Sequence, residues 1–141
     1  IEGGKLMAGI EAAIRSVLVA DASVDALVDG RIYPWMRQQG SVFPAIVYEL
    51  DDTEPSEGLG GHLDLTRVTI TINSIAETYS GTKELASDVR AAMNGYTGTS
   101  EGVVIKSVIH DNDTGIVEDS EIGNSRGVST IVSEYIIWYE S

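Results

Sequence analysis

The sequence predicts an α+β fold, in which an antiparallel sheet of about four strands of mixed length carries two main helices on one face. Segments with helical and strand patterns do not alternate regularly along the chain, so a parallel sheet is not expected. The length of 141 residues fits one domain. We place that domain at residues 7–141, because the apolar pattern begins only after Met7, and we interpret residues 1–6 as a remnant of cloning.

Helical spacing of apolar residues predicts two main helices and one short helix. The first main helix spans residues 8–20. Its apolar stripe consists of Ile10, Ile14, Val17 and Leu18. A short helix is expected within residues 21–30, between capping-type residues and a glycine stop. The second main helix can be capped by Thr78 or Ser80 and is expected to end near Asn94.

Four longer segments have the composition and patterning of strands. They are Phe43–Leu50, Leu65–Ile75, Val103–Ile109 and Val128–Tyr139. The second of these alternates strictly between apolar and polar residues, which indicates one buried and one wetter face. Residues 31–34 form a brief extended segment that ends at a proline. The acidic, glycine-containing segment Asp51–Gly61 is expected to be a flexible hairpin arm, and the segment Asp111–Arg126 is expected to be an exposed arm or a partly disordered loop.

The charge of the chain is strongly negative, with 22 acidic and nine basic residues and a formal net charge of −13. Such a surface repels phosphate backbones and anionic membranes, so neither direct sequence-specific nucleic-acid binding nor membrane binding is expected. No apolar stretch approaches the roughly 18 residues of a membrane span. Cysteine is absent, which excludes disulfides and thiol chemistry.

No motif in the sequence points to catalysis, to a cofactor or to a metal. His62 and His110 stand in no metal-ligand spacing. Residues 111–115 resemble a calcium loop, but their glycine stands one residue early, and a solvated acidic turn is the simpler interpretation. Neither a nucleophile elbow nor a phosphate loop is present. We therefore expect a protein that is not an enzyme and that carries no cofactor.

Large aromatic residues and acidic clusters are the features that fit an interface between subunits. Aromatic side chains at strand ends and loops are favoured at interfaces, although completing the monomer core is an equally good interpretation of them. An arginine can also pair with the acidic arm of a neighbour. The candidate interface residues are Trp35, Met36, Asp51, Asp52, Glu54, Asp111, Asp113, Glu118, Arg126, Tyr135 and Trp138.

The order of the packing patterns along the chain is itself informative. The patterns are Ile10–Leu18, Asp21–Val28, Gly30–Pro34, Phe43–Tyr48, Val68–Ile72, Leu85–Met93 and Ser133–Tyr139. In this order, over almost all of the chain from Met7 onward, they resemble the bacteriophage tail-completion, or head-to-tail joining, protein family, which also occurs in prophages. The segment Asp111–Arg126 departs from the family pattern because it is richer in glycine and charge.

The resemblance implies an α+β subunit similar to tail-terminator proteins. Such a subunit assembles with copies of itself into a ring, expected to be a hexamer, at the head-proximal end of the tail. Its other expected partners are phage tail or head-connector proteins. It would be a virion component that is assembled in the cytoplasm of the bacterial host.

Two other classes of protein stay open from the residues alone. One is a small α+β ligand-binding protein or enzyme with a cleft between sheet and helices, which would have to use His62, His110 or the acidic clusters. The other is an acidic adaptor whose arms become ordered on calcium or on a basic partner.

Overall fold

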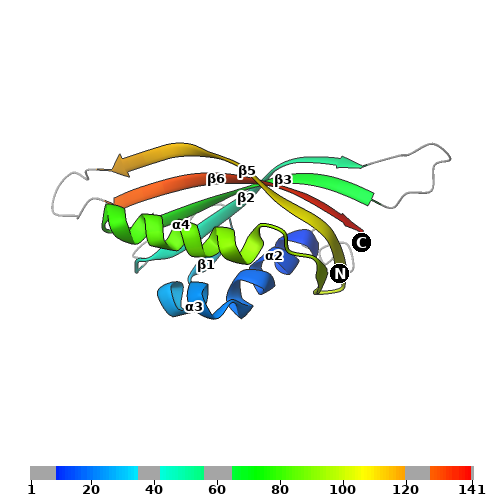
Figure 1. Cartoon of the computed structure of the whole chain (residues 1–141), viewed down its shortest axis with the longest axis horizontal. Helices are drawn as coiled ribbons and strands as arrows, with labels where there is room; N and C mark the ends of the chain where they lie inside the picture. The colour runs from blue at the N-terminus through cyan, green and yellow to red at the C-terminus, as the bar shows by residue number, and fades with distance from the viewer. Residues whose placement is uncertain (1–8, 35–41, 56–64, 120–127, 141) are drawn as a thin grey trace.

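In the residues that the computed structural model describes, three helices lie on one face of a six-stranded sheet (Figure 1). The structure describes residues 9–34, 42–55, 65–119 and 128–140, with the backbone alone for 52–55, 114–119 and 128. The helices are α2 (Gly9–Ala20), α3 (Ala22–Val28) and α4 (Tyr79–Met93). The strands are β1 (Ile32–Pro34), β2 (Ala45–Pro55), β3 (Leu65–Ala76), β4 (Gly98–Ser100), β5 (Val103–Asp119) and β6 (Val128–Glu140).

The sheet is mixed and not purely antiparallel. Its strand order is β1-β2-β3-β6-β5-β4, in which β1 runs parallel to β2 and the other neighbouring pairs are antiparallel. The expected α+β class is confirmed, but the expectation of about four strands is wrong in detail. The four long strands form the centre, and the three-residue strands β1 and β4 flank them. β1 lies within the extended segment expected at residues 31–34, whereas β4 was not predicted, because three residues are too few to form a periodic pattern.

Local hydrogen bonds set the ends of the helices. The carboxylate of Asp21 accepts a hydrogen bond from the backbone N–H of Val24 at 3.0 Å and begins α3. Asp29 ends that helix in a left-handed conformation with a φ of 49°. Of the two expected caps of α4, Thr78 is the one used, because its hydroxyl accepts from the N–H of Gly81 at 3.0 Å. The three predicted helices are thereby confirmed.

The hydrophobic core lies between the helices and the side of the sheet that faces them. On β3 the alternating residues Val68, Ile70 and Ile72 are fully buried, as the strict alternation predicted. The helices contribute Leu18 from α2 and Leu85 from α4, which are also fully buried. Burying each such side chain contributes roughly 1.5–3 kcal/mol, so this face of the sheet specifies the register of the strands.

Strand β5 is much longer than expected and contains much of the predicted acidic arm. It pairs with β6 as far as Asp119, so this part of the segment is a strand and not a disordered loop. Asp111, Asn112 and Asp113 are exposed, as expected of an arm. In the same way, β2 continues past Leu50 to Pro55. Each register shift in the β5 ladder inverts the alternation of side chains, which hides the strand in the sequence. The shifts lie between Ile105 and Ser107, His110 and Asn112, and Asp113 and Gly115.

The strands β2 and β5 each have one edge that is only partly covered by a neighbouring strand among the described residues. β1 pairs with β2 only at residues 46–48, so residues 49–55 of β2 have β3 alone beside them. On the other side of the sheet, β4 covers residues 103–105 of β5, and the Asn94–Gly95 turn bonds the next stretch of its backbone. Residues 111–119 of β5 then have β6 alone beside them.

Candidate functional site

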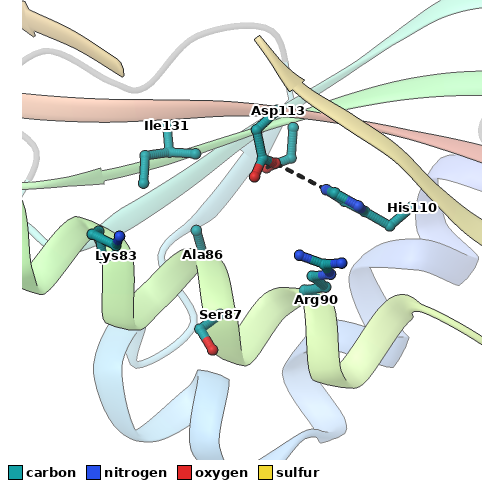
Figure 2. A pocket seen from close by; sticks show the side chains of 8 residues that line it. Lys83, Ala86, Ser87, Arg90, His110, Asp113 and Ile131 are labelled. Carbon is teal, nitrogen blue, oxygen red and sulfur yellow. Dashed lines mark hydrogen bonds and ion pairs between the residues drawn. The ribbon is translucent and has the colours of Figure 1, made fainter. Parts of the chain in front are cut away.

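A pocket of about 370 Å³ lies between α4 and the strands β5 and β6 (Figure 2). Lys83, Ser87 and Arg90 line it from α4, because residues four and seven apart share one side of a helix. His110 and Asp113 line it from β5. Figure 2 shows the two cationic side chains of the helix on one side and the His110–Asp113 pair on the other.

His110 and Asp113 share this pocket because of a β-bulge. Residues three apart on a regular strand lie on opposite faces of the sheet. The register shift between His110 and Asn112 adds one residue to β5. As a result His110 stands opposite Tyr135 and Asp113 opposite Ser133, and these two β6 positions lie on the same face. The bulge therefore turns both titratable side chains toward α4.

One carboxylate oxygen of Asp113 accepts hydrogen bonds from both of its neighbours. His110 Nε2 lies 2.9 Å from Asp113 Oδ1, and the hydroxyl of Ser133 donates to the same oxygen at 2.8 Å. In a nucleophilic triad the serine would instead donate to the histidine, which would remove its proton. Since Ser133 donates to the carboxylate, these three side chains lack the bond that activates a nucleophile.

The electrostatics of the pocket favour an ionised Asp113. Burial opposes the negative charge of this carboxylate. Hydrogen bonds from His110 and Ser133, followed by the positive charges of His110 and Arg90, outweigh burial and lower its pKa below the usual value. Tyr135 is shifted in the opposite sense, because burial and then the charge of Asp113 raise the pKa of its hydroxyl. The carboxylate is therefore charged and the phenol neutral at neutral pH.

Tyr135 occupies the core next to this pocket. Its side chain is fully buried, because the odd-numbered residues in this part of β6 face the helices. Its ring meets the ring of His110 edge to face, with the centroids 5.2 Å apart. No hydrogen-bond partner for its hydroxyl is found in the described part of the chain. Tyr135 thus has the core role that the sequence left open for the aromatic residues.

The other candidate interface residues whose side chains the structure describes do not gather at one site. Asp51 is exposed and accepts a hydrogen bond from the hydroxyl of Thr71. Asp111 is also exposed and accepts one from the side chain of Asn112. Trp138 is half-buried in register with Ser107, on the face of the sheet away from the helices. Outside the description, in whole or in side chain, lie Trp35, Met36, Asp52, Glu54, His62, Glu118 and Arg126.

Sequence reasoning missed the cationic side of the pocket. The one available signal is the spacing of Lys83 and Arg90, since residues seven apart lie on the same side of a helix. No sequence signal brings His110 and Asp113 to these two residues. That contact depends on how α4 packs on the sheet and on the bulge in β5.

The described residues contain neither a membrane-spanning helix nor a cluster of metal ligands. No helix among the described residues is long and apolar enough to cross a membrane. Within the described ranges, no group of three or more histidine, cysteine or acidic side chains is arranged to hold a metal ion. Residues 111–115, whose composition is similar to that of a calcium loop, form part of strand β5.

Comparison with known proteins gives a similar fold among solved structures and a match to one sequence family. No curated protein matches the chain in sequence. A solved chain from the virion of a native gene transfer agent particle is similar over 96% of this chain and 97% of its own, with a TM-score of 0.68 and 17% identity, which shows a shared fold. The match to another solved chain covers 90% of this chain and 94% of that chain, with 12% identity and a TM-score of 0.46. The sequence pattern of the family described as tail completion protein gp17 matches residues 12–133. Because this match spans most of the chain, the protein belongs to the tail completion protein gp17 family.

Proposed function

We propose that this chain is a structural component of a phage or prophage tail and that it closes the head-proximal end of the tail by forming a ring, expected to be a hexamer. The observation that carries the proposal is the family match over residues 12–133. The fold shared with a chain of a gene transfer agent virion supports it. The ring would contact other tail or head-connector proteins and would be assembled in the cytoplasm of the bacterial host.

The two free strand edges support ring formation. Residues 49–55 of β2 and residues 111–119 of β5 lie toward opposite edges of the sheet. Each stretch has one neighbouring strand among the described residues. Because β2, β3, β6 and β5 alternate in direction, β2 and β5 run antiparallel to each other. The β5 edge of one copy can therefore pair antiparallel with the β2 edge of the next. Contacts between two different surfaces of identical subunits form a ring when the rotation from one copy to the next closes, and an open filament when it does not.

The net charge of −13 bears on what such a ring can do with DNA. A polyanion is repelled by an acidic surface, so the ring does not bind DNA directly in this proposal. An acidic lumen would instead let DNA slide through without sticking. The charge thus suits a passage better than a nucleic-acid binding site.

Small-molecule binding is the second candidate function, and the pocket between α4 and β5 is the observation that favours it. Its volume and its convergent polar groups fit a small ligand. A thermal-shift screen of metabolites tests this candidate, because a ligand that binds only the folded chain raises the melting temperature. If a ligand raises the melting temperature and no assembly is seen at any concentration, small-molecule binding would be favoured over ring formation.

Assembly itself is tested by light scattering over a concentration series, followed by negative-stain electron microscopy. We expect a ring-sized mass and visible rings or stacked tubes at high concentration. Amide hydrogen exchange of the same samples should slow at residues 49–55 and 111–119 as the mass increases, because edge N–H groups become bonded. A monomer or compact dimer at every concentration, with no rings, would contradict the proposal.

A further inference from the structure

We infer that the pocket between α4 and β5 binds an acidic α-amino acid such as glutamate, with its α-carboxylate on Arg90, its ammonium group on Asp113 and its side-chain carboxylate on Lys83. The inference rests on the second candidate function above, small-molecule binding, and names the class of ligand for that site. It is independent of ring formation, because every group involved lies within one chain.

Hydrogen bonds at both ends of α4 fix the order of the groups along the pocket. The hydroxyl of Thr82 donates to the carbonyl oxygen of Ser129 at 3.1 Å, near the start of β6. At the other end, the side-chain oxygen of Asn94 accepts from the backbone N–H of His110 at 2.9 Å. The start of α4 therefore lies beside the start of β6, and the end of α4 lies beside the middle of β5.

The lining groups follow one another as positive, apolar, negative and positive. Lys83 lies at one end of the pocket in Figure 2, and the apolar side chains of Ala86 and Ile131 lie between it and Asp113. Arg90 lies on the far side of Asp113. An acidic α-amino acid presents the complementary order, which is a carboxylate, a short methylene chain, and then an ammonium group beside a second carboxylate.

The guanidinium of Arg90 is available to a ligand. Among the described residues, no hydrogen bond or ion pair holds it, and the side chain is exposed on α4. By contrast, Arg15 donates to the carbonyl oxygen of Ile32 at 3.2 Å. Arg31 likewise donates to the carbonyl oxygen of Pro44 at 3.0 Å. An unpaired guanidinium offers a planar fork of donors that matches a carboxylate, so we place the α-carboxylate of the ligand on Arg90.

One oxygen of the Asp113 carboxylate is left for the ammonium group. The hydrogen bonds with His110 and Ser133 both use Oδ1, and no described residue bonds the other oxygen. The side chain of Asp113 is 46% exposed, so a ligand can reach its carboxylate from the pocket. Because this carboxylate is ionised at neutral pH, it attracts an ammonium group and repels another anion.

Lys83 completes the site at the end away from His110. Its side chain is exposed, and its Nζ lies 5.5 Å from the centre of the Tyr79 ring. The rise of α4 between Lys83 and Arg90 is about 10 Å, which is longer than a glutamate molecule. The flexible stems of both side chains close the difference, and a lysine ammonium binds a carboxylate from many directions.

The net charge of the pocket also fits this class of ligand. Lys83 and Arg90 supply two positive charges and Asp113 one negative charge, so these three side chains together carry one positive charge. Two carboxylates and one ammonium group give the ligand one negative charge. A phosphate group fits less well, because it has no donor for Asp113 and is repelled by it. A volume of about 370 Å³ is at the small end of ligand pockets and suits a small ligand.

A titration with L-glutamate, followed through the imidazole signals of His110 by NMR, tests the site. We expect Arg90→Gln to raise the dissociation constant about tenfold or more, because it removes the charged fork. Lys83→Gln should raise it by about threefold, since exposed ion pairs contribute less. The matched control is Lys106→Gln, which removes the same charge from an exposed β5 residue outside the pocket and should change it by less than about twofold. Circular dichroism checks that each variant folds.

A ligand without the ammonium group tests the role of Asp113. Glutarate has both carboxylates of glutamate and no amino group, so wild type should bind L-glutamate about tenfold more tightly than glutarate. Asp113→Asn should remove most of this preference, because a neutral amide neither attracts the ammonium group nor repels a carboxylate. Asp111→Asn, outside the pocket on the same strand, should keep it. Equal binding of the two ligands by wild type, or a preference that Asp113→Asn leaves unchanged, would overturn the assignment.

Failure of this assignment is distinguishable from failure of the functions proposed above. No response to about 10 mM L-glutamate would overturn it, because a site with a dissociation constant of about 1 mM is mostly filled at that concentration. If the metabolite screen then finds a ligand of another class in the same pocket, small-molecule binding survives and only the class of ligand is wrong. Light scattering reports on the ring separately, whatever the titration gives.

Discussion

Asp113 connects the charge of the pocket to the stability of the fold. Hydrogen bonds from His110 and Ser133 lower its pKa even though burial acts in the opposite direction. A carboxylate with a lowered pKa in the folded chain stabilises that chain at all pH values above its unfolded pKa of about 3.9. This contribution is lost as the pH falls through the folded value, so the sign of the effect is acid destabilisation.

We predict that Asp113→Asn weakens the dependence of stability on pH below about 4, because the linked proton is removed. Wild type should lose stability steeply over this window and the variant should lose less. The midpoint of thermal unfolding, followed by circular dichroism over a pH series, measures this. Asp111→Asn, at an exposed position of the same strand, is the control. Parallel profiles for wild type and Asp113→Asn would contradict the prediction.

The hydroxyl of Tyr135 gives a second prediction at this scale. Tyr135→Phe should leave the free energy of unfolding unchanged or raise it by up to about 1 kcal/mol, because it removes a buried hydroxyl that has no partner and keeps the ring. Tyr135→Ala should instead cost about 3–5 kcal/mol, since it leaves a cavity in the core. Urea unfolding measures both. A clear loss in the phenylalanine variant would mean that the hydroxyl does have a bonding partner.

At the scale of secondary structure, the start of α4 is set by one residue. Thr78 accepts from the N–H of Gly81, and a Cβ placed at Gly81 would lie 2.9 Å from the hydroxyl oxygen of Thr78. The capping hydroxyl of Thr78 therefore occupies the space that a side chain at position 81 would need. Any larger residue at position 81 has to displace the capping hydroxyl.

We predict that Thr78→Ala lowers the free energy of unfolding by about 1 kcal/mol, because one N–H at the helix start loses its acceptor. Ser80→Ala should have little effect, since Thr78 and not Ser80 is the cap. Gly81→Ala should also be destabilising in wild type, and less so in the Thr78→Ala background, where the crowded hydroxyl is gone. Additive effects of the two substitutions would argue against this contact.

At the scale of the whole molecule, the two faces of the sheet contribute unequally to the stability of a single subunit. The helices cover one face (Figure 1), and Leu85 of α4 is fully buried against it. On the other face Ile109 is 49% exposed and stands in register with Ile136. The stability of a single subunit therefore comes mainly from the helix-covered face.

We predict that Leu85→Ala costs about 2–5 kcal/mol of unfolding free energy and Ile109→Ala less than about 1.5 kcal/mol in dilute solution. Denaturant unfolding at low protein concentration measures the difference. The comparison is made at low concentration because an assembled form could cover the exposed face. Equal losses for the two variants would show that Ile109 is as well packed as Leu85, contrary to its exposure.

Local pattern was sufficient for much of this protein. The α+β class, the three helices and the two-sided strand β3 all follow from the spacing of apolar residues, which reflects burial directly. The resemblance to the tail-completion family rests on the same patterns taken in order, and the family match over residues 12–133 agrees with it. These features are local, so the sequence alone determined them.

Only the tertiary structure decided the edges of the sheet and the pocket. Pairing with β6 holds the acidic residues 111–119 in a strand, because backbone hydrogen bonds form whatever the side chains are. The bulge after His110 then changes which side chains face α4, and so brings Asp113 to Arg90. The orientation of β6 against the helices places the side chain of Tyr135 in the core. Each of these depends on contacts between segments far apart in the chain, which periodicity does not encode.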